Sequence, residues 1–233
     1  MPSSEHRARA WLQQTAVVFN KDVLIETRTG EVLTTSVFFA VLVVILSSLS
    51  YYLGPETRYQ VAAGVIWLAV AFATILSLSR SWQREREESA FDALITSPLM
   101  PSALFAGKAC SLLAFLAVVE AVVIPATALF FNVNLLTSGA GLLLLALAAT
   151  PGIAFSATLF GLMTVRTRAR DLVLAIVLFP LLCPTLLAAV VATRELLSGM
   201  PLGELSDYLV LMLVFDVVFL AGGLALFGTL AEE

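Results

Sequence analysis

Six long apolar runs, separated by short polar stretches, make up most of this chain. Each run has at least about the 20 residues that a helix needs to cross the ~30 Å hydrocarbon core of a membrane. The runs are Thr34–Leu53, Tyr59–Ser79, Ala103–Phe131, Gly139–Thr164, Leu172–Thr193 and Tyr208–Leu230. Val37–Leu46 lacks the apolar–polar alternation of a membrane β-strand, so the runs predict helices. We expect an all-α membrane protein with one six-span membrane domain over residues 34–233.

The first 33 residues carry a different pattern, with charged residues and no long apolar run. Within Trp11–Ile25, an apolar stripe at helical spacing passes through Leu12, Ala16, Phe19 and Val23. Such a stripe is typical of a helix that lies in the membrane interface, and its leading tryptophan suits the headgroup region. No early apolar core marks a cleavable signal peptide, so we expect the first span to act as an uncleaved anchor.

The composition agrees with a membrane protein and leaves no room for a soluble domain. Hydrophobic residues make up 60% of the chain and charged residues 13%, against about 25% charged in soluble domains. The mean hydropathy is +0.97. The net charge of −4 identifies no partner by itself. We expect the chain to be surrounded by lipid and to bind no nucleic acid.

The basic residues predict the orientation of the chain, because basic residues near span ends stay in the cytosol. With a cytosolic N-terminus, eleven basic residues fall on the cytosolic side, namely Arg7, Arg9, Lys21, Arg28, Arg80, Arg84, Arg86, Lys108, Arg166, Arg168 and Arg170. The outer side receives only Arg58 and Arg194. This distribution places both termini in the cytosol.

The segment Arg84–Pro101 concentrates charge between the second and third runs. Its charged residues are Arg84, Glu85, Arg86, Glu87, Glu88 and Asp92. Its apolar residues at helical spacing are Phe91, Leu94 and Ile95. The pattern predicts an amphipathic helix over about residues 84–97 that ends at Pro98 and Pro101. A surface helix that faces a soluble partner and a solvated loop that only holds the topology are both compatible with it.

Two carboxyl groups fall inside the predicted spans, Glu120 in the third and Asp216 in the sixth. A charged carboxylate at the centre of a span costs about 2.5–3.5 kcal/mol, so such residues usually face a bundle interior and find a partner there. A functional helix contact is one interpretation. The other is a protonated carboxyl that hydrogen-bonds a Thr or Ser of a neighbouring helix.

Prolines interrupt the fifth run at Pro180 and Pro184, which share one helical face at i, i+4 spacing. Each removes a backbone donor and bends the helix, which neighbouring helices tolerate in a membrane. The two bends predict either a conformational change at this span or a fixed shape of the bundle.

Residues for catalysis or for cofactor binding are missing from the spans. Ser102–Ala109 (SALFAGKA) echoes a phosphate-binding loop, but Ser102 replaces the first glycine and Ala109 replaces the metal-binding hydroxyl. The single histidine, His6, precedes all six spans, and no Cys-x-x-Cys-His haem-attachment motif occurs. We therefore expect no enzymatic activity, no resident cofactor and no metal site in this chain.

Three stretches resemble a known family. Glu85–Lys108 (EREESAFDALITSPLMPSALFAGK) is similar to the coupling-helix region of type-2 ABC transporter permeases, although Ser89-Ala90 stands where Gly-Thr is usual. Phe19–Glu31 (FNKDVLIETRTGE) and Thr167–Ala189 (TRARDLVLAIVLFPLLCPTLLAA) narrow the match. The chain resembles the CcmB family, the haem exporter B proteins of bacterial cytochrome c maturation.

This resemblance implies a type-2 ABC exporter fold in the bacterial inner membrane, with an N-terminal elbow helix and a cytosolic coupling helix. The implied coupling residues are Arg84, Glu85, Arg86, Glu87, Glu88, Phe91, Asp92, Leu94 and Pro98. The implied partners are a CcmA-like ATPase that holds ATP, CcmC-like and CcmD-like membrane subunits, and a CcmE-like haem chaperone. Haem is the implied cargo. ATP hydrolysis in the partner would drive haem transfer or release of the chaperone, and the lack of an iron ligand in the spans favours transmission of motion.

Two other functions remain open. The chain could be a type-2 ABC permease for a drug, lipid or polysaccharide, against which the LFPLLCP segment argues. It could instead be a secondary transporter with Glu120 and Asp216 as coupling groups. Such transporters often contain inverted repeats, and residues 1–131 and 132–233 show no convincing similarity.

Overall fold

The computed structural model describes residues 4–50, 55–87, 98–164 and 170–232. All regular elements in these ranges are helices: α1 (Ser4–Thr29), α2 (Glu31–Ser50), α3 (Pro55–Glu87), α5 (Pro101–Phe131), α6 (Leu135–Thr164), α7 (Arg170–Leu197), η1 (Leu202–Leu205) and α8 (Ser206–Glu232). Six of them, α2, α3 and α5 to α8, contain segments long and apolar enough to cross a membrane. The predicted fold class, an all-α multi-pass membrane protein, is confirmed.

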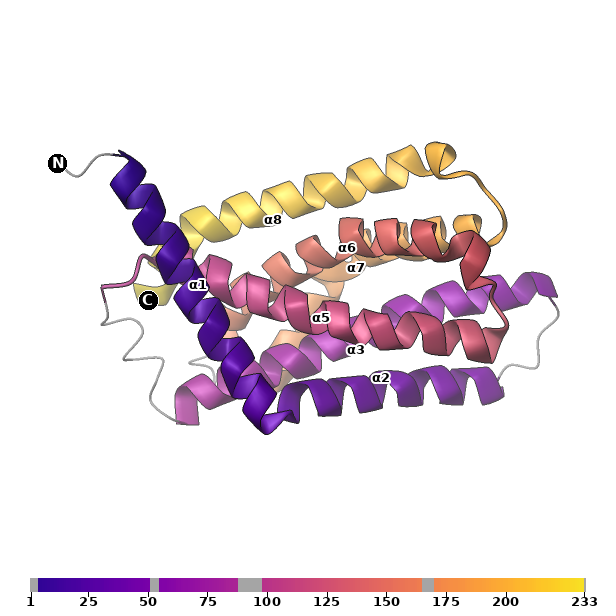
Figure 1. The fold of residues 1–233 in the computed structure, drawn as a ribbon, viewed down its shortest axis with the longest axis horizontal. Coiled ribbons are helices and arrows are strands. Elements are labelled where there is room, and N and C mark those ends of the chain that lie inside the picture. The colour runs from indigo at the N-terminus through magenta and orange to yellow at the C-terminus, as the bar shows by residue number, and fades with distance from the viewer. Residues whose placement is uncertain (1–3, 51–54, 88–97, 165–169, 233) are drawn as a thin grey trace.

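The six spans lie side by side, and α1 crosses one end of the bundle obliquely over the start of α5 (Figure 1). The end of α8 lies at this same end. Helix α6 is the centre of the bundle, because 72% of its 18-residue apolar window is buried and it contacts α3, α5, α7 and α8. Only 17% of the corresponding window of α8 and 22% of that of α2 are buried. These two helices are apolar on their outer faces as well, which is typical of helices that face lipid.

Helix α3 continues well past the apolar run that predicted it. The run ends at Ser79, but α3 ends at Glu87, so Arg84, Glu85, Arg86 and Glu87 belong to the helix of the second span. The predicted amphipathic helix therefore does not begin as a separate element at residue 84. Its remaining residues Glu88, Phe91, Asp92 and Leu94 lie outside the described part of the chain.

Pro101 begins a helix, while the predicted end of the preceding helix at Pro98 and Pro101 stays a prediction, because residues 88–97 lie outside the described part of the chain. Pro101 is the first residue of α5, after Met100, whose backbone is extended (φ −68°, ψ 127°). Proline suits this position because the first N–H groups of a helix have no intrahelical acceptor. Pro98 lies in a bend before it.

A single residue, Gly30, connects α1 to α2. Its φ of +62° is in the left-handed region, which glycine adopts without steric cost. The Gly30 N–H donates to the carbonyl of Glu26 at 2.7 Å. The side chain of Glu26 accepts a hydrogen bond from the Leu33 N–H at 2.7 Å. Glu26 thus caps the first turn of α2 and fixes the angle between the two helices.

Glycines allow close helix contacts in the bundle. A Cβ atom at Gly107 of α5 would lie 2.6 Å from the Cβ of Val18 of α1. A Cβ at Gly223 of α8 would lie 2.0 Å from the Phe105 ring of α5. Lipid is as apolar as leucine, so close packing of this kind is what holds membrane helices together. Phe105 also packs against the ring of Phe227, with 5.5 Å between ring centroids.

Candidate functional site

A buried ion pair joins α1 to α5. Lys108 is 4% exposed, and its Nζ lies 3.0 Å from Asp22 Oδ2 and donates a hydrogen bond to Asp22 Oδ1 at 3.2 Å. The ammonium also lies 5.4 Å from the ring centroid of Trp82 in α3, within the range of a cation–π contact. Lys21 Nζ lies 3.4 Å from the same aspartate. This cluster ties three helices together near one end of the bundle.

The start of α5 is held by two side chains of α1. Gln14 Oε1 accepts a hydrogen bond from the Met100 N–H at 2.9 Å, and Gln14 Nε2 donates to the Pro98 carbonyl at 3.4 Å. One turn earlier, Trp11 Nε1 donates to Ser102 Oγ at 3.0 Å. These hydrogen bonds therefore fix the chain to α1 on both sides of Pro101, the first residue of α5.

The sequence pattern did not reveal this α1–α5 joint. The predicted stripe lies about 100° around α1 from this joint. Its residues Leu12 and Ala16 are exposed, whereas Phe19 and Val23 are partly buried. The face that packs on α5 carries Val18 and Asp22, both buried. The available signal was a second set of residues at helical spacing, Trp11, Val18, Asp22 and Glu26. Because two of its members are acidic, this set does not form an apolar stripe.

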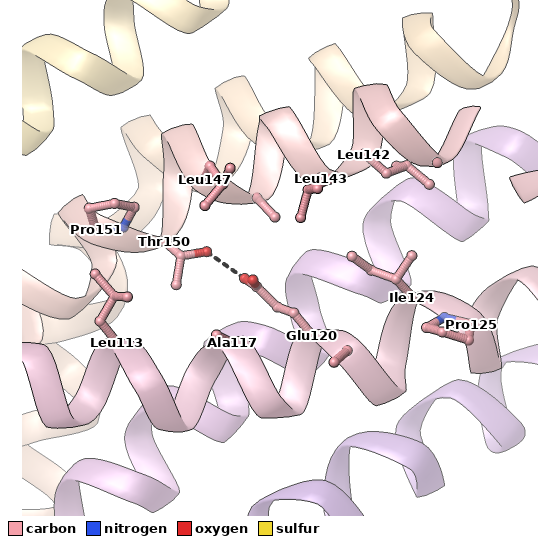
Figure 2. A pocket seen from close by; sticks show the side chains of 13 residues that line it. Leu113, Ala117, Glu120, Ile124, Pro125, Leu142, Leu143, Leu147, Thr150 and Pro151 are labelled. Atoms are coloured by element: carbon pink, nitrogen blue, oxygen red, sulfur yellow. Dashed lines mark hydrogen bonds between the residues drawn. The ribbon is translucent and has the colours of Figure 1, made fainter. Parts of the chain in front are cut away.

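The predicted intramembrane residue Glu120 lies at a helix contact. It is 7% exposed, and the Thr150 hydroxyl of α6 donates to Glu120 Oε1 at 2.5 Å (Figure 2). The interpretation of a carboxyl that meets a threonine of a neighbouring helix agrees with this geometry. Both residues line a groove of ≈ 270 Å³ between α5 and α6. All other side chains that line it are apolar or glycine.

The second predicted acid, Asp216, lies against the same turn of α6 from α8. A Cβ atom at Gly152 would lie 2.3 Å from Asp216 Oδ1, so only glycine permits this approach. Thr150 and Gly152 are two residues apart, which places them on opposite faces of α6. The two acids therefore meet one turn of the central helix from opposite sides. The sequence indicated each acid as a candidate, but it did not indicate that both lie against the same turn of α6.

Pro180 and Pro184 both lie inside α7, which continues from Arg170 to Leu197. Both are exposed on the outer face of the helix. They do not take part in the cluster around Lys108 or in the contacts of Glu120 and Asp216, so a role in conformational change stays a prediction. Within the described residues, no group of three His, Cys, Asp or Glu side chains is close enough to bind a metal ion.

Comparison with known proteins connects this geometry to a family. The model of the CcmB protein family matches residues 13–229, from α1 to α8. The chain belongs to the CcmB family. Within this family it is 26% identical to Heme exporter protein B of Bradyrhizobium diazoefficiens over 188 residues, which cover 79% of this chain and 82% of the relative. It is 27% identical to Heme exporter protein B of Paracoccus denitrificans over 184 residues, which cover 77% and 82%.

The CcmB match includes the contacts between α1 and α5, except for Trp11, and both intramembrane acids, because it covers residues 13–229. The protein of the same name from Pseudomonas aeruginosa is 25% identical over 180 residues, 76% of this chain and 79% of the relative. The resemblance that the sequence motifs indicated is confirmed at the level of the family.

Proposed function

We propose that this chain is the membrane permease subunit of an ABC-type haem exporter that serves cytochrome c maturation. The observation that carries the proposal is the CcmB match over residues 13–229, together with relatives named Heme exporter protein B. The chain itself is not an enzyme. ATP binds to a separate CcmA-like subunit, whose hydrolysis this chain couples to haem transfer or to release of a haem chaperone.

The proposed orientation of the chain in the membrane follows from the distribution of its basic residues. The end of the bundle with α1, the last turns of α3 and the start of α5 faces the cytosol, because eleven of the thirteen basic residues belong to that side. Both termini are cytosolic, and the chain resides in the bacterial inner membrane. The segment 1–33 is a cytosolic elbow, and residues 34–233 form the membrane domain.

The described contacts support a route for motion from the ATPase. The charged residues Arg84–Glu87 at the end of α3 and the connection that follows dock on the ATPase. One branch of the route is α3 itself, which is continuous from Glu87 into the membrane. The other branch passes from Pro98 and Met100 to Gln14 of α1. From α1 it continues through Gly30 and Glu26 into α2.

Haem is the cargo of the complex, and further subunits complete it. CcmC-like and CcmD-like membrane proteins and a CcmE-like haem chaperone are the proposed partners. This chain offers apolar helix faces to such partners, above all on α8 and α2, which are mostly exposed. Its part in the cycle is to transmit the motion of the ATPase to the subunits that hold haem.

The experiment that tests this function is deletion of the gene in its host, followed by complementation. Covalent haem on c-type cytochromes is measured by haem staining, with noncovalent b-type haem as the internal control. We expect c-type cytochromes to lose haem, b-type cytochromes to keep it, and the intact gene to restore haem to the c-type cytochromes. Normal c-type haem in the deletion strain, with export of another compound lost, would assign the chain to a different ABC exporter.

A further inference from the structure

The groove between α5 and α6 opens on the outer flank of the bundle. Its volume is ≈ 270 Å³, and two of its lining residues, Leu143 and Leu147, are 61% and 67% exposed. Glu120 is the one ionisable residue among those that line it. Figure 2 shows the groove between the two helices, with Thr150 and Glu120 facing each other across it.

One oxygen of the Glu120 carboxyl, Oε2, is available for a hydrogen bond with another molecule. Thr150 donates its only hydroxyl proton to Oε1. Oε2 has no hydrogen-bond partner among the described residues. It is also absent from the fully buried atoms that lack a partner, so part of its surface is accessible. Because Glu120 as a whole is 7% exposed and lines the groove, this oxygen is reached from the groove.

Two prolines add further acceptors to the same groove. Pro125 lacks the N–H that would bond the carbonyl of Ala121, and Pro151 lacks the N–H that would bond the carbonyl of Leu147. All four residues line the groove. Besides the Thr150 hydroxyl, the residues that line the groove thus carry one carboxyl oxygen without a partner and two carbonyls that lack their helical donors. A complementary occupant brings hydrogen-bond donors and positive charge.

We propose that this groove receives a transmembrane helix of a different membrane protein, which places a lysine or arginine side chain against Glu120. A helix supplies an apolar surface for the leucines of the groove, and an ammonium or guanidinium supplies donors without acceptors. A carboxyl at membrane depth usually finds a partner of this kind inside a bundle. The contact is independent of the cargo that the complex exports.

The depth of Glu120 argues against a lipid as the occupant. Glu120 lies eleven residues before the last residue of α5, Phe131, on the order of 16 Å along the helix. That is about half of the ~30 Å hydrocarbon core, so a lipid headgroup at the surface does not reach it. An acyl chain would fill the groove but leave the carboxyl oxygen unpaired, which is unfavourable.

A second copy of this chain cannot supply the basic group. The sequence contains thirteen Lys and Arg residues, and twelve of them lie outside the apolar runs. The exception, Lys108, is buried in its ion pair with Asp22. The partner is therefore another protein.

Site-specific photo-crosslinking in native membranes tests this proposal. A photoreactive amino acid replaces Leu147 in the groove, or Val218 on α8 as the matched control. Both positions are exposed, and each lies twelve residues after the first residue of its helix (147 − 135 and 218 − 206). Crosslinked peptides are identified by mass spectrometry, in the parent chain and in the variants Glu120→Gln and Thr150→Val.

We expect the Leu147 probe to capture an apolar segment of another protein that contains a lysine or arginine. Glu120→Gln keeps an acceptor for Thr150 but removes the charge, so capture falls by about tenfold or more. Thr150→Val removes the internal hydrogen bond and leaves the carboxyl, so capture persists. The Val218 probe gives the same products in all variants.

Four results would overturn the proposal. The Leu147 probe could capture only lipid, only haem or a second copy of this chain. It could capture a segment without a basic residue. Capture could be the same in the parent chain and in Glu120→Gln. Finally, Thr150→Val could reduce capture as strongly as Glu120→Gln, which would mean that Glu120 only holds α5 to α6.

Discussion

The double reversal Glu87→Lys and Glu88→Lys is expected to abolish ATP-driven activity while membrane insertion stays normal. Glu87 is the last residue of α3, and Glu88 follows it in the charged connection that we assign to the ATPase contact. Opposed like charges at an interface cost several kcal/mol, and each 1.4 kcal/mol is a factor of ten in affinity. Haem attachment to c-type cytochromes should fall by about tenfold or more.

The matched control for this reversal is Glu204→Lys with Asp207→Lys. Glu204 and Asp207 are exposed, and their reversal gives the same change in net charge, but they lie at the other end of the bundle, in η1 and the first turn of α8. We expect this variant to keep cytochrome maturation. A secondary transporter should be nearly indifferent to both reversals, so activity retained in Glu87→Lys/Glu88→Lys would contradict the ABC assignment.

Lys108→Met is expected to cause the largest loss of stability of any single substitution in the α1–α5 joint. It leaves Asp22 buried without its main countercharge, and breaking a buried pair in this way costs about 3–5 kcal/mol. Lys21, 3.4 Å from Asp22, offsets part of this cost, because its side chain is only partly exposed and stays in reach. The measurement is the free energy of unfolding in mild detergent, with proteolysis of α1 as a local readout.

Two further variants separate the ion pair from general disruption. Lys108→Met combined with Asp22→Leu removes both charges and should recover much of the lost stability, because an apolar pair of similar size is often neutral. Arg80→Met breaks the exposed contact with Glu31, whose nearest atoms are 3.4 Å apart, and should cost at most about 1 kcal/mol. Equal losses in Lys108→Met and Arg80→Met would mean that burial of the pair contributes nothing.

The spans were predictable because each needs a long apolar run, and such runs are rare by chance. The third span illustrates this, with Ala103–Phe131 predicted and Pro101–Phe131 found. The end of α3 was not predictable from hydropathy, since charged residues end an apolar run without ending a helix. Arg84–Glu87 therefore form the last turn of a spanning helix, although their charge indicated a separate element.

The contacts of the candidate site were less predictable than its residues. Glu120 and Asp216 were identifiable because carboxyl groups are costly in a membrane. That both lie against one turn of α6, at Thr150 and Gly152, depends on how three helices pack. The pair of Lys108 and Asp22 joins residues 86 positions apart, and a single sequence contains no signal for such a contact. In the sequence, Lys108 stands out as a marker of topology and as part of two motif-like stretches, but not as the partner of a buried acid.

The central claim is that this chain works as the permease of an ATP-driven complex, and gentle purification from native membranes tests it most directly. The tagged protein is extracted under conditions that keep other membrane complexes intact, and its partners are identified by mass spectrometry. We predict an ATP-binding subunit together with at least one further membrane subunit of the haem pathway. A preparation that retains other complexes but contains no ATPase would contradict the account.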